Sequence, residues 1–114
     1  MFKFSPNIAV NVKSYSEAVT FYRDTLGFEV VKQTEKETHF KKGELNFFIE
    51  ENETNPRQVF FEFEVENFIE AETRLLAEGC VITSPYSERN KMFSDKYGLN
   101  FHVYEKGVEL PGCS

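Results

Sequence analysis

Two glutamates and a histidine alternate with apolar residues, an arrangement that brings polar side chains to one face of a β-strand. Glu62 and Glu64 alternate in this way within 60–65, and His102 does so within 100–104. Side chains two residues apart along a strand lie about 7 Å from each other on the same face. Both carboxylates are therefore expected to point at one volume and to form an anionic wall for a cationic ligand. The alternative is that one or both lie at an open rim and are simply hydrated.

His102 is predicted to share that face, and its imidazole permits three roles. It can be a hydrogen-bonded polar group in a concave wall, a group that contacts the ligand, or a metal ligand. His39 is expected at a solvent-facing position of a hairpin. No nucleophile stands at a suitable spacing from a base, and the two cysteines, Cys80 and Cys113, form no CxxC pair. We therefore predict no catalytic residue.

Aromatic and amide side chains complete the predicted face. Three aromatic rings can stack on planar ligand groups or can serve a dimer interface. Two asparagines add hydrogen-bonding groups, and a further carboxylate joins from a neighbouring strand. The predicted ligand-binding residues are Asn7, Asn11, Phe48, Glu50, Phe60, Glu62, His102 and Tyr104.

The composition excludes some classes of partner. A net charge of −6 without any Lys/Arg cluster argues against nucleic acid, because phosphate binding needs a basic stripe. No segment is long and apolar enough for a signal peptide or a membrane span. We therefore expect a cytoplasmic location, where Cys113 in a predicted tail would be a free thiol.

One pattern occurs twice along the chain. In each copy an alternating strand precedes a residue suited to cap a helix, with Glu three residues later, and a glycine follows the helix. Val12 to Gly27 spans 15 residues and Val65 to Gly79 spans 14. The predicted caps are Ser14 with Glu17 in the first copy and Asn67 with Glu70 in the second. The apolar stripe of the first helix is Tyr15, Ala18, Phe21, Tyr22 and Leu26, and that of the second is Phe68, Ala71 and Leu75.

Strands are expected after each helix, and the fold class follows. The predicted strands are 28–31, 38–41 and 45–50 in the first copy, and 81–83, 91–94 and 100–104 in the second. We predict an α+β domain of two βαβββ modules, whose curved, mostly antiparallel sheet surrounds a cleft and carries the helices on its outer face. Module one covers about 5–50, a linker 51–57, module two about 58–106 and a tail 107–114. The predicted core is Ile8, Val10, Val12, Leu45, Phe47, Ile49, Phe61, Phe63, Val65, Phe101 and Val103.

The same segments resemble a known group of proteins. The stretch "NIAVNV", the later "FYRDTLGFEV" and the turn "DKYGLNF" are similar to the vicinal-oxygen-chelate superfamily of glyoxalase I, bleomycin-resistance proteins and extradiol dioxygenases. The resemblance runs from Asn7 to about Glu105. It implies paired βαβββ units around a cleft, commonly completed by a homodimer.

The resemblance also implies four positions for metal ligands in the metal-dependent members. They fall on Asn7, on Phe48 or Glu50, on Phe60 and on His102. Phe60 cannot bind a metal, and Asn7 stands where histidine is usual, whereas a catalytic divalent ion needs about three protein ligands. The sequence therefore predicts no cofactor, with one divalent ion at Glu50, Glu62 and His102 as the alternative.

Two hypotheses about function follow. The first is a small-molecule-binding protein that resembles the bleomycin-resistance members and sequesters a cationic or aromatic ligand without chemistry. The alternative is a metal-dependent glyoxalase-like lyase or isomerase, or a dioxygenase, with a non-standard ligand set. A protein–protein or regulatory module on the same fold is a third possibility.

Overall fold

The structure is a computed structural model that describes residues 1–108, and these residues fall into two compact units. We call Pro6–Phe60 the first unit, and Met1–Ser5 together with the described residues from Phe61 onward the second unit. The first residues belong to the second unit because strand β1 (Lys3–Phe4) pairs antiparallel with β6 (Val59–Val65). Cys113 and most of the predicted tail lie outside the described residues.

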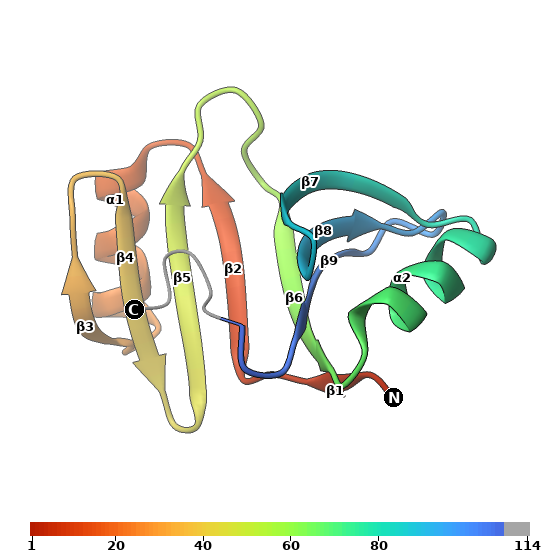
Figure 1. The fold of residues 1–114 in the computed structure, drawn as a ribbon. Helices are drawn as coiled ribbons and strands as arrows, with labels where there is room; N and C mark the ends of the chain where they lie inside the picture. Colours follow the sequence, from red (N-terminus) through yellow and green to blue (C-terminus); the bar gives the residue numbers. More distant parts are fainter. Residues whose placement is uncertain (109–114) are drawn as a thin grey trace. The chain divides into compact units, whose positions relative to one another are not determined.

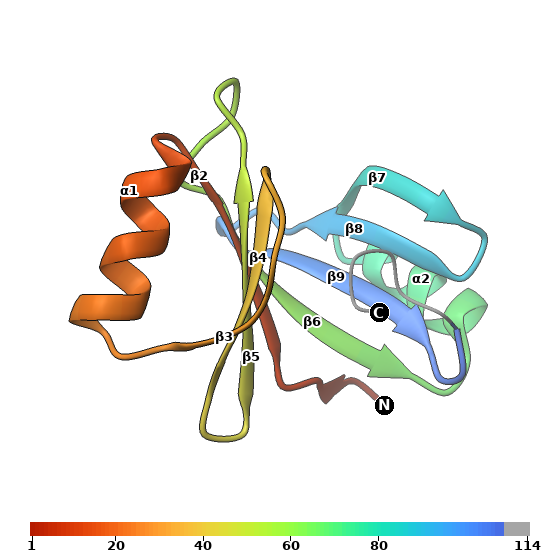
Figure 2. The ribbon, with the colours of Figure 1, turned by 90° about the vertical axis from the view of Figure 1, so that its left-hand side faces the viewer.

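The first unit places a helix on one face of a small sheet, as Figures 1 and 2 show. Its elements are β2 (Asn7–Val12), α1 (Tyr15–Thr20), the π-helical turn η1 (Phe21–Thr25), β3 (Glu29–Gln33), β4 (Glu37–Lys42) and β5 (Leu45–Glu51). The strand order is β3-β4-β5-β2; β2 is parallel to β5, and the other pairs are antiparallel. The first residues of β6, Val59 and Phe60, pair with β2 in this unit.

The second unit repeats the βαβββ order. Its elements are β6, α2 (Phe68–Ala77), β7 (Val81–Ser87), β8 (Asn90–Ser94) and β9 (Asn100–Glu105), and its strand order is β6-β9-β8-β7 with β1 also beside β6. Across residues 1–108 the strands number nine, in mixed but mostly antiparallel pairing. The predicted α+β class with a repeated module is therefore confirmed.

The start of each helix tests the predicted caps. Asn67 caps α2 as predicted, because its side chain accepts a hydrogen bond from the Glu70 backbone at 3.1 Å. Ser14 also precedes α1, but its φ of 57° is left-handed and its side chain makes no capping hydrogen bond. The capping box predicted with Glu17 is therefore wrong, because that box needs an extended residue at the cap.

The helix of the first unit ends in a wider turn than the sequence predicts. The Leu26 amide donates to the Phe21 carbonyl at 3.2 Å, a five-residue step that shifts the apolar stripe. Leu26, which follows the widened turn, is therefore exposed; Phe21 precedes that turn and is exposed because, six residues after Tyr15, it lies off the stripe. Tyr15, Ala18 and Tyr22 pack in the core together with Val19. The prediction that Phe21 and Leu26 face the core is wrong.

The alternation within the strands is confirmed by the two cores. In the first unit Val10 and Ile49 are buried beneath α1, and Val12 and Phe47 pack against them. In the second unit the buried residues beneath α2 include Val65, Phe101 and Val103, with Phe61 and Phe63 beside them. Two predicted core residues belong to neither core: Ile8 is half-buried, and Leu45 lies at the surface. Leu45 is 46% exposed, because β5 begins there at the end of a hairpin.

Candidate functional site

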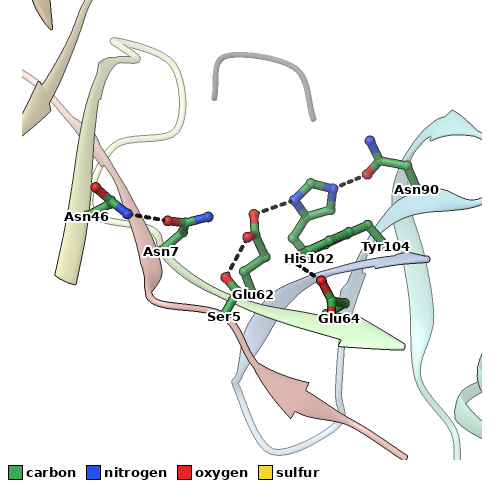
Figure 3. A network of polar contacts seen from close by, with 8 residues as sticks. All are labelled: Ser5, Asn7, Asn46, Glu62, Glu64, Asn90, His102 and Tyr104. Carbon is green, nitrogen blue, oxygen red and sulfur yellow. Dashed lines mark hydrogen bonds and ion pairs between the residues drawn. The ribbon is translucent and has the colours of Figure 1, made fainter. Parts of the chain in front are cut away.

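A polar network in the second unit is centred on the carboxylate of Glu62. The Ser5 hydroxyl donates to Glu62 Oε1 at 2.5 Å, and Glu62 Oε2 lies 3.2 Å from His102 Nδ1. Figure 3 shows these side chains pointing toward one another from three different segments. Glu62 is 6% exposed, so this carboxylate is held by protein groups far more than by water.

The second nitrogen of His102 is also engaged. His102 Nε2 contacts Oδ1 of Asn90, the buried first residue of β8. Both ring nitrogens of an imidazole can hydrogen-bond, and here each has a partner, the carboxylate of Glu62 on one side and the amide of Asn90 on the other. His102 is therefore held in one orientation, and neither ring nitrogen is available to a reactant.

A second carboxylate and a phenol extend the network. The Tyr104 hydroxyl donates to Glu64 Oε1 at 3.4 Å. Burial, together with the nearby charges of Glu62 and Glu64, raises the pKa of Tyr104 to about 12. At neutral pH Tyr104 is therefore a phenol that donates its proton to a carboxylate.

Two tyrosine rings flank the imidazole of His102. The ring centroids of Tyr86 and His102 are 5.6 Å apart and those of His102 and Tyr104 are 6.1 Å apart. Tyr86 was not predicted as a site residue, because the strand was expected to end at 83 and β7 continues to Ser87. β7 contains Pro85, which this strand tolerates because it lies at the edge of the sheet.

The first unit has a polar row of its own across three strands. His39 Nε2 lies 2.9 Å from Asn46 Oδ1, and the Asn46 amide donates to Asn7 Oδ1 at 3.0 Å. The His39 ring stacks on Phe48 with centroids 4.4 Å apart. The prediction that His39 faces solvent in a hairpin is therefore wrong: it is half-buried and holds two neighbours.

The predicted site residues are thus divided between the units. Glu62, His102 and Tyr104 come together in the second unit, with Ser5 and Asn90 as partners that sequence reasoning missed. The first unit holds the other predicted residues, Asn7, Asn11, Phe48, Glu50 and Phe60. Among these, Asn7 joins the polar row, Phe48 stacks on His39, and Asn11 donates to Gln58 at 3.3 Å.

Glu50 faces another carboxylate in the first unit. Glu37 lies directly opposite it in the pairing of β4 with β5. Partial burial and the charge of Glu50 raise the pKa of Glu37. The folded state therefore keeps this proton to higher pH than the unfolded chain does, so stability falls as the pH rises above the ordinary glutamate value.

Replacing Glu37 with glutamine is therefore expected to stabilise the protein at pH 7. We expect a gain of about 0.5 kcal/mol, since like charges directly opposite in a sheet destabilise it by that order. The gain should vanish near pH 4, where an ordinary glutamate is about half protonated. Urea denaturation at both pH values measures it, with Glu35→Gln, an exposed residue of a turn, as the control. Equal gains at the two pH values would contradict the explanation.

The donor set offers little to a metal ion. Among residues 1–108, no group of three or more His, Cys, Asp or Glu side chains lies together in a way that could hold one. Glu62 and His102 are close, but Glu50 belongs to the other unit. The alternative ligand set is therefore not assembled within either unit.

The second unit also contains a pocket of about 380 Å³ away from this network. It lies on the α2 side of the sheet, where its walls include Phe2, Leu75, Cys80, Leu99 and Phe101. Burial raises the pKa of the Cys80 thiol, so it stays protonated and poorly nucleophilic at neutral pH. In the part of the chain that the structure describes, no helix has the length and apolarity needed to traverse a membrane.

Comparison with known proteins gives a family and several similar folds. The family model described as "Glyoxalase/Bleomycin resistance protein/Dioxygenase superfamily" matches residues 6–103. A member of that superfamily from Vibrio splendidus 12B01 superposes with a TM-score of 0.65 at 17% identity, over 93% of this chain and 100% of that one. No curated protein matches the sequence.

Two enzyme structures are also similar in fold. The Mn(II)-bound glyoxalase from Novosphingobium aromaticivorans has a TM-score of 0.68 at 16% identity, over 98% of this chain and 44% of that one. An extradiol ring-cleaving dioxygenase from B. fuscum has a TM-score of 0.69 at 14% identity, over 97% of this chain and 34% of that one. This chain therefore spans less than half of either enzyme, and likenesses at these identities show the fold alone.

Proposed function

Because the chain belongs to the Glyoxalase/Bleomycin resistance protein/Dioxygenase superfamily, we propose that it is a small-molecule-binding protein. Its ligand is a cationic molecule with an aromatic part, which it sequesters without chemistry. The site is the network of the second unit around Glu62 and His102. Bleomycin-resistance proteins, which the family description names, are the members that this function resembles.

The charge balance of the network is the observation that supports a cationic ligand. Glu62 and Glu64 contribute two carboxylates, and the imidazole of His102 contacts Glu62. Even with a charged imidazole, these three side chains together carry a net negative charge, which attracts a positively charged group at short range. Their contacts include the neutral hydroxyls of Ser5 and Tyr104, which add no positive charge.

The flanking rings support an aromatic or alkylammonium part of the ligand. Tyr86 is 52% exposed beside His102, so one face of the network is an accessible aromatic surface. A cation over a tyrosine face gains electrostatic energy from the ring, and a planar ligand group can stack there. An anionic network with an accessible ring therefore suits an arylalkyl amine or an amidine.

Calorimetry with 1-naphthylmethylammonium tests this function. We expect the wild-type protein to bind it, and we expect Glu62→Gln/Glu64→Gln to bind it about tenfold more weakly, because charge-assisted contacts of this kind contribute about 1.4 kcal/mol or more. The control is Glu66→Gln/Glu70→Gln, which removes two exposed carboxylates from the same unit. Equal binding by all three proteins, or equally strong binding of neutral 1-naphthalenemethanol, would defeat the proposal.

A metal-dependent glyoxalase-like or dioxygenase activity is the second candidate. The contact between Glu62 and His102 favours it, since both are common metal ligands. Among residues 1–108 no third His, Cys, Asp or Glu side chain joins that pair, so we derive no catalytic step through a metal.

Metal analysis of protein prepared without chelators separates the two candidates. We expect less than stoichiometric divalent metal, unchanged in His102→Ala. Stoichiometric Ni, Zn, Fe or Mn that is lost in His102→Ala would favour the enzyme. The homodimer and the cytoplasmic location that the sequence predicts stay predictions.

A further inference from the structure

The first unit contains a pocket of about 520 Å³ beside α1, remote in sequence from the Glu62 network. It is formed by the end of β2, the segment that leads into α1, the helix itself and the residues just before β6. Of the residues predicted to bind a ligand, only Asn11 is among its walls. The lining residues are Val10, Asn11, Val12, Lys13, Ser14, Ala18, Tyr22, Arg57 and Val59.

The charged groups of this pocket are all cationic. Lys13 and Arg57 line it, and no Asp or Glu does. Within residues 1–108 neither cation is seen in an ion pair. The chain as a whole has 19 acidic and 13 basic residues, so a pocket lined by two cations and no carboxylate differs in charge from the protein as a whole.

The backbone is strained where the polar rim is formed. Ser14 and Arg57, with φ of 57° and 68°, are the non-glycine residues of the described chain with positive φ, and both line this pocket. Such a conformation costs on the order of 1–3 kcal/mol and persists when surrounding contacts enforce it. Here the Arg57 amide donates to the Asn11 carbonyl at 2.8 Å, and the Asn11 amide donates to the Gln58 carbonyl at 2.9 Å. The fold thus holds Arg57 at the rim at the expense of local strain.

The floor of the pocket is apolar. Side chains of Val10, Val12, Ala18 and Tyr22 belong to the core beneath α1, and Val59 is 42% exposed beside them. Apolar surface left open to water favours a ligand with a hydrocarbon or aromatic body. Cations above an apolar floor select an anionic group joined to such a body.

We propose that this pocket binds a small organic anion, in which a carboxylate or phosphate group contacts Lys13 and Arg57 and an aromatic or aliphatic body lies on the valine and tyrosine floor. The site is distinct from the Glu62 network in position and in the charge that it selects. The two sites would let one chain bind molecules of opposite charge independently.

The test uses probes that share one aromatic body and differ in charge. Titration of the full chain at low ionic strength with 1-naphthoate and 1-naphthyl phosphate, followed by NMR and calorimetry, is expected to show binding that moves the methyl signals of Ala18 and Val12. In Lys13→Gln/Arg57→Asn we expect at least fivefold weaker binding, since two partly exposed charge contacts are lost. Asparagine is chosen at 57 because it adopts positive φ more readily than most residues.

Matched measurements separate this site from the proposed function. The control variant Lys36→Gln/Lys41→Gln removes two exposed cations from the same unit and should bind 1-naphthoate like the wild type. The Lys13/Arg57 variant should still bind 1-naphthylmethylammonium, because the Glu62 network is unchanged. Undetectable binding of both anions, unchanged affinity in the Lys13/Arg57 variant, or equally tight binding of neutral 1-naphthalenemethanol would overturn the inference. Tighter binding of the phosphate than of the carboxylate would identify phosphate as the preferred group and support the site.

Discussion

His102→Ala is expected to destabilise the protein by about 3 kcal/mol at pH 7. The imidazole lies 3.2 Å from Glu62, a carboxylate that is only 6% exposed. Removing a hydrogen-bond partner of a buried polar group costs about 1–3 kcal/mol, and more when that group is charged. We expect a value near 3 kcal/mol because the substitution also removes the contact with Asn90, although the Ser5 hydroxyl, at 2.5 Å, still donates to Glu62. Urea denaturation with an unchanged m-value measures the loss.

A double variant separates the charge effect from the loss of packing. In Glu62→Gln/His102→Ala the buried site has no charge to compensate, so we expect about half of the lost stability to return. His39→Ala is the matched control, since this half-buried histidine contacts an amide and an aromatic ring and not a carboxylate. It should cost about 1 kcal/mol. If His102→Ala costs no more than His39→Ala, then the contact of His102 with the buried Glu62 carboxylate adds no stability beyond that of an ordinary hydrogen bond.

The same contact connects stability with binding. Glu62 already contacts His102 and Glu64 already contacts Tyr104, so a positively charged ligand must approach carboxylates that have partners in the protein. The net negative charge of the network, and not a vacant carboxylate, is therefore the basis of the proposed selectivity. This explains why the variant that removes both glutamates is the informative one for binding, whereas His102→Ala is the informative one for stability.

The alternation of the strands could be predicted from the sequence because it depends only on local geometry. Side chains alternate across a strand, so the valines of β2 had to lie on the face that α1 covers in the first unit, and Phe61 and Phe63 of β6 on the face that α2 covers in the second. The same alternation predicts that Glu62 lies on the other face of β6 from Phe61 and Phe63, and it does so in the structure. The turn at Asp95 is also local: its carboxylate accepts from the Tyr97 and Leu99 amides at 2.8 and 2.9 Å.

The partners of the site residues could not be predicted, because they depend on pairing between distant segments. Ser5 reaches Glu62 only because β1 adds to β6, 57 residues further along the chain. Asn90 lies just before the predicted strand 91–94, and it becomes a partner of His102 because β8 begins one residue earlier than predicted and pairs with β9. A two-residue strand has too little pattern to be recognised, and register is set by the whole sheet.

The widened turn of η1 limits prediction for a different reason. Helical periodicity assumes 3.6 residues per turn, and one five-residue turn displaces every later position on the stripe. Leu26 is displaced in this way and is 42% exposed. Phe21, 48% exposed, lies ahead of the widened turn and off the regular stripe, whereas Phe93, which is not in the predicted core, is fully buried. Phe93 lies in a short strand whose few residues show little alternation.

This contrast leads to the prediction with the largest expected effect, a comparison of two identical substitutions. Phe93→Ala should cost about 4 kcal/mol, because it removes a buried ring and leaves a cavity. That ring stacks on Phe101, with centroids 5.9 Å apart, and lies 6.4 Å from Phe68, so neighbours on β9 and α2 lose contacts together. Phe21→Ala removes the same atoms from a half-exposed position and should cost less than about 1 kcal/mol. Denaturant midpoints of the two variants measure the difference, and similar midpoints would show that the packing described here beneath α2 is wrong.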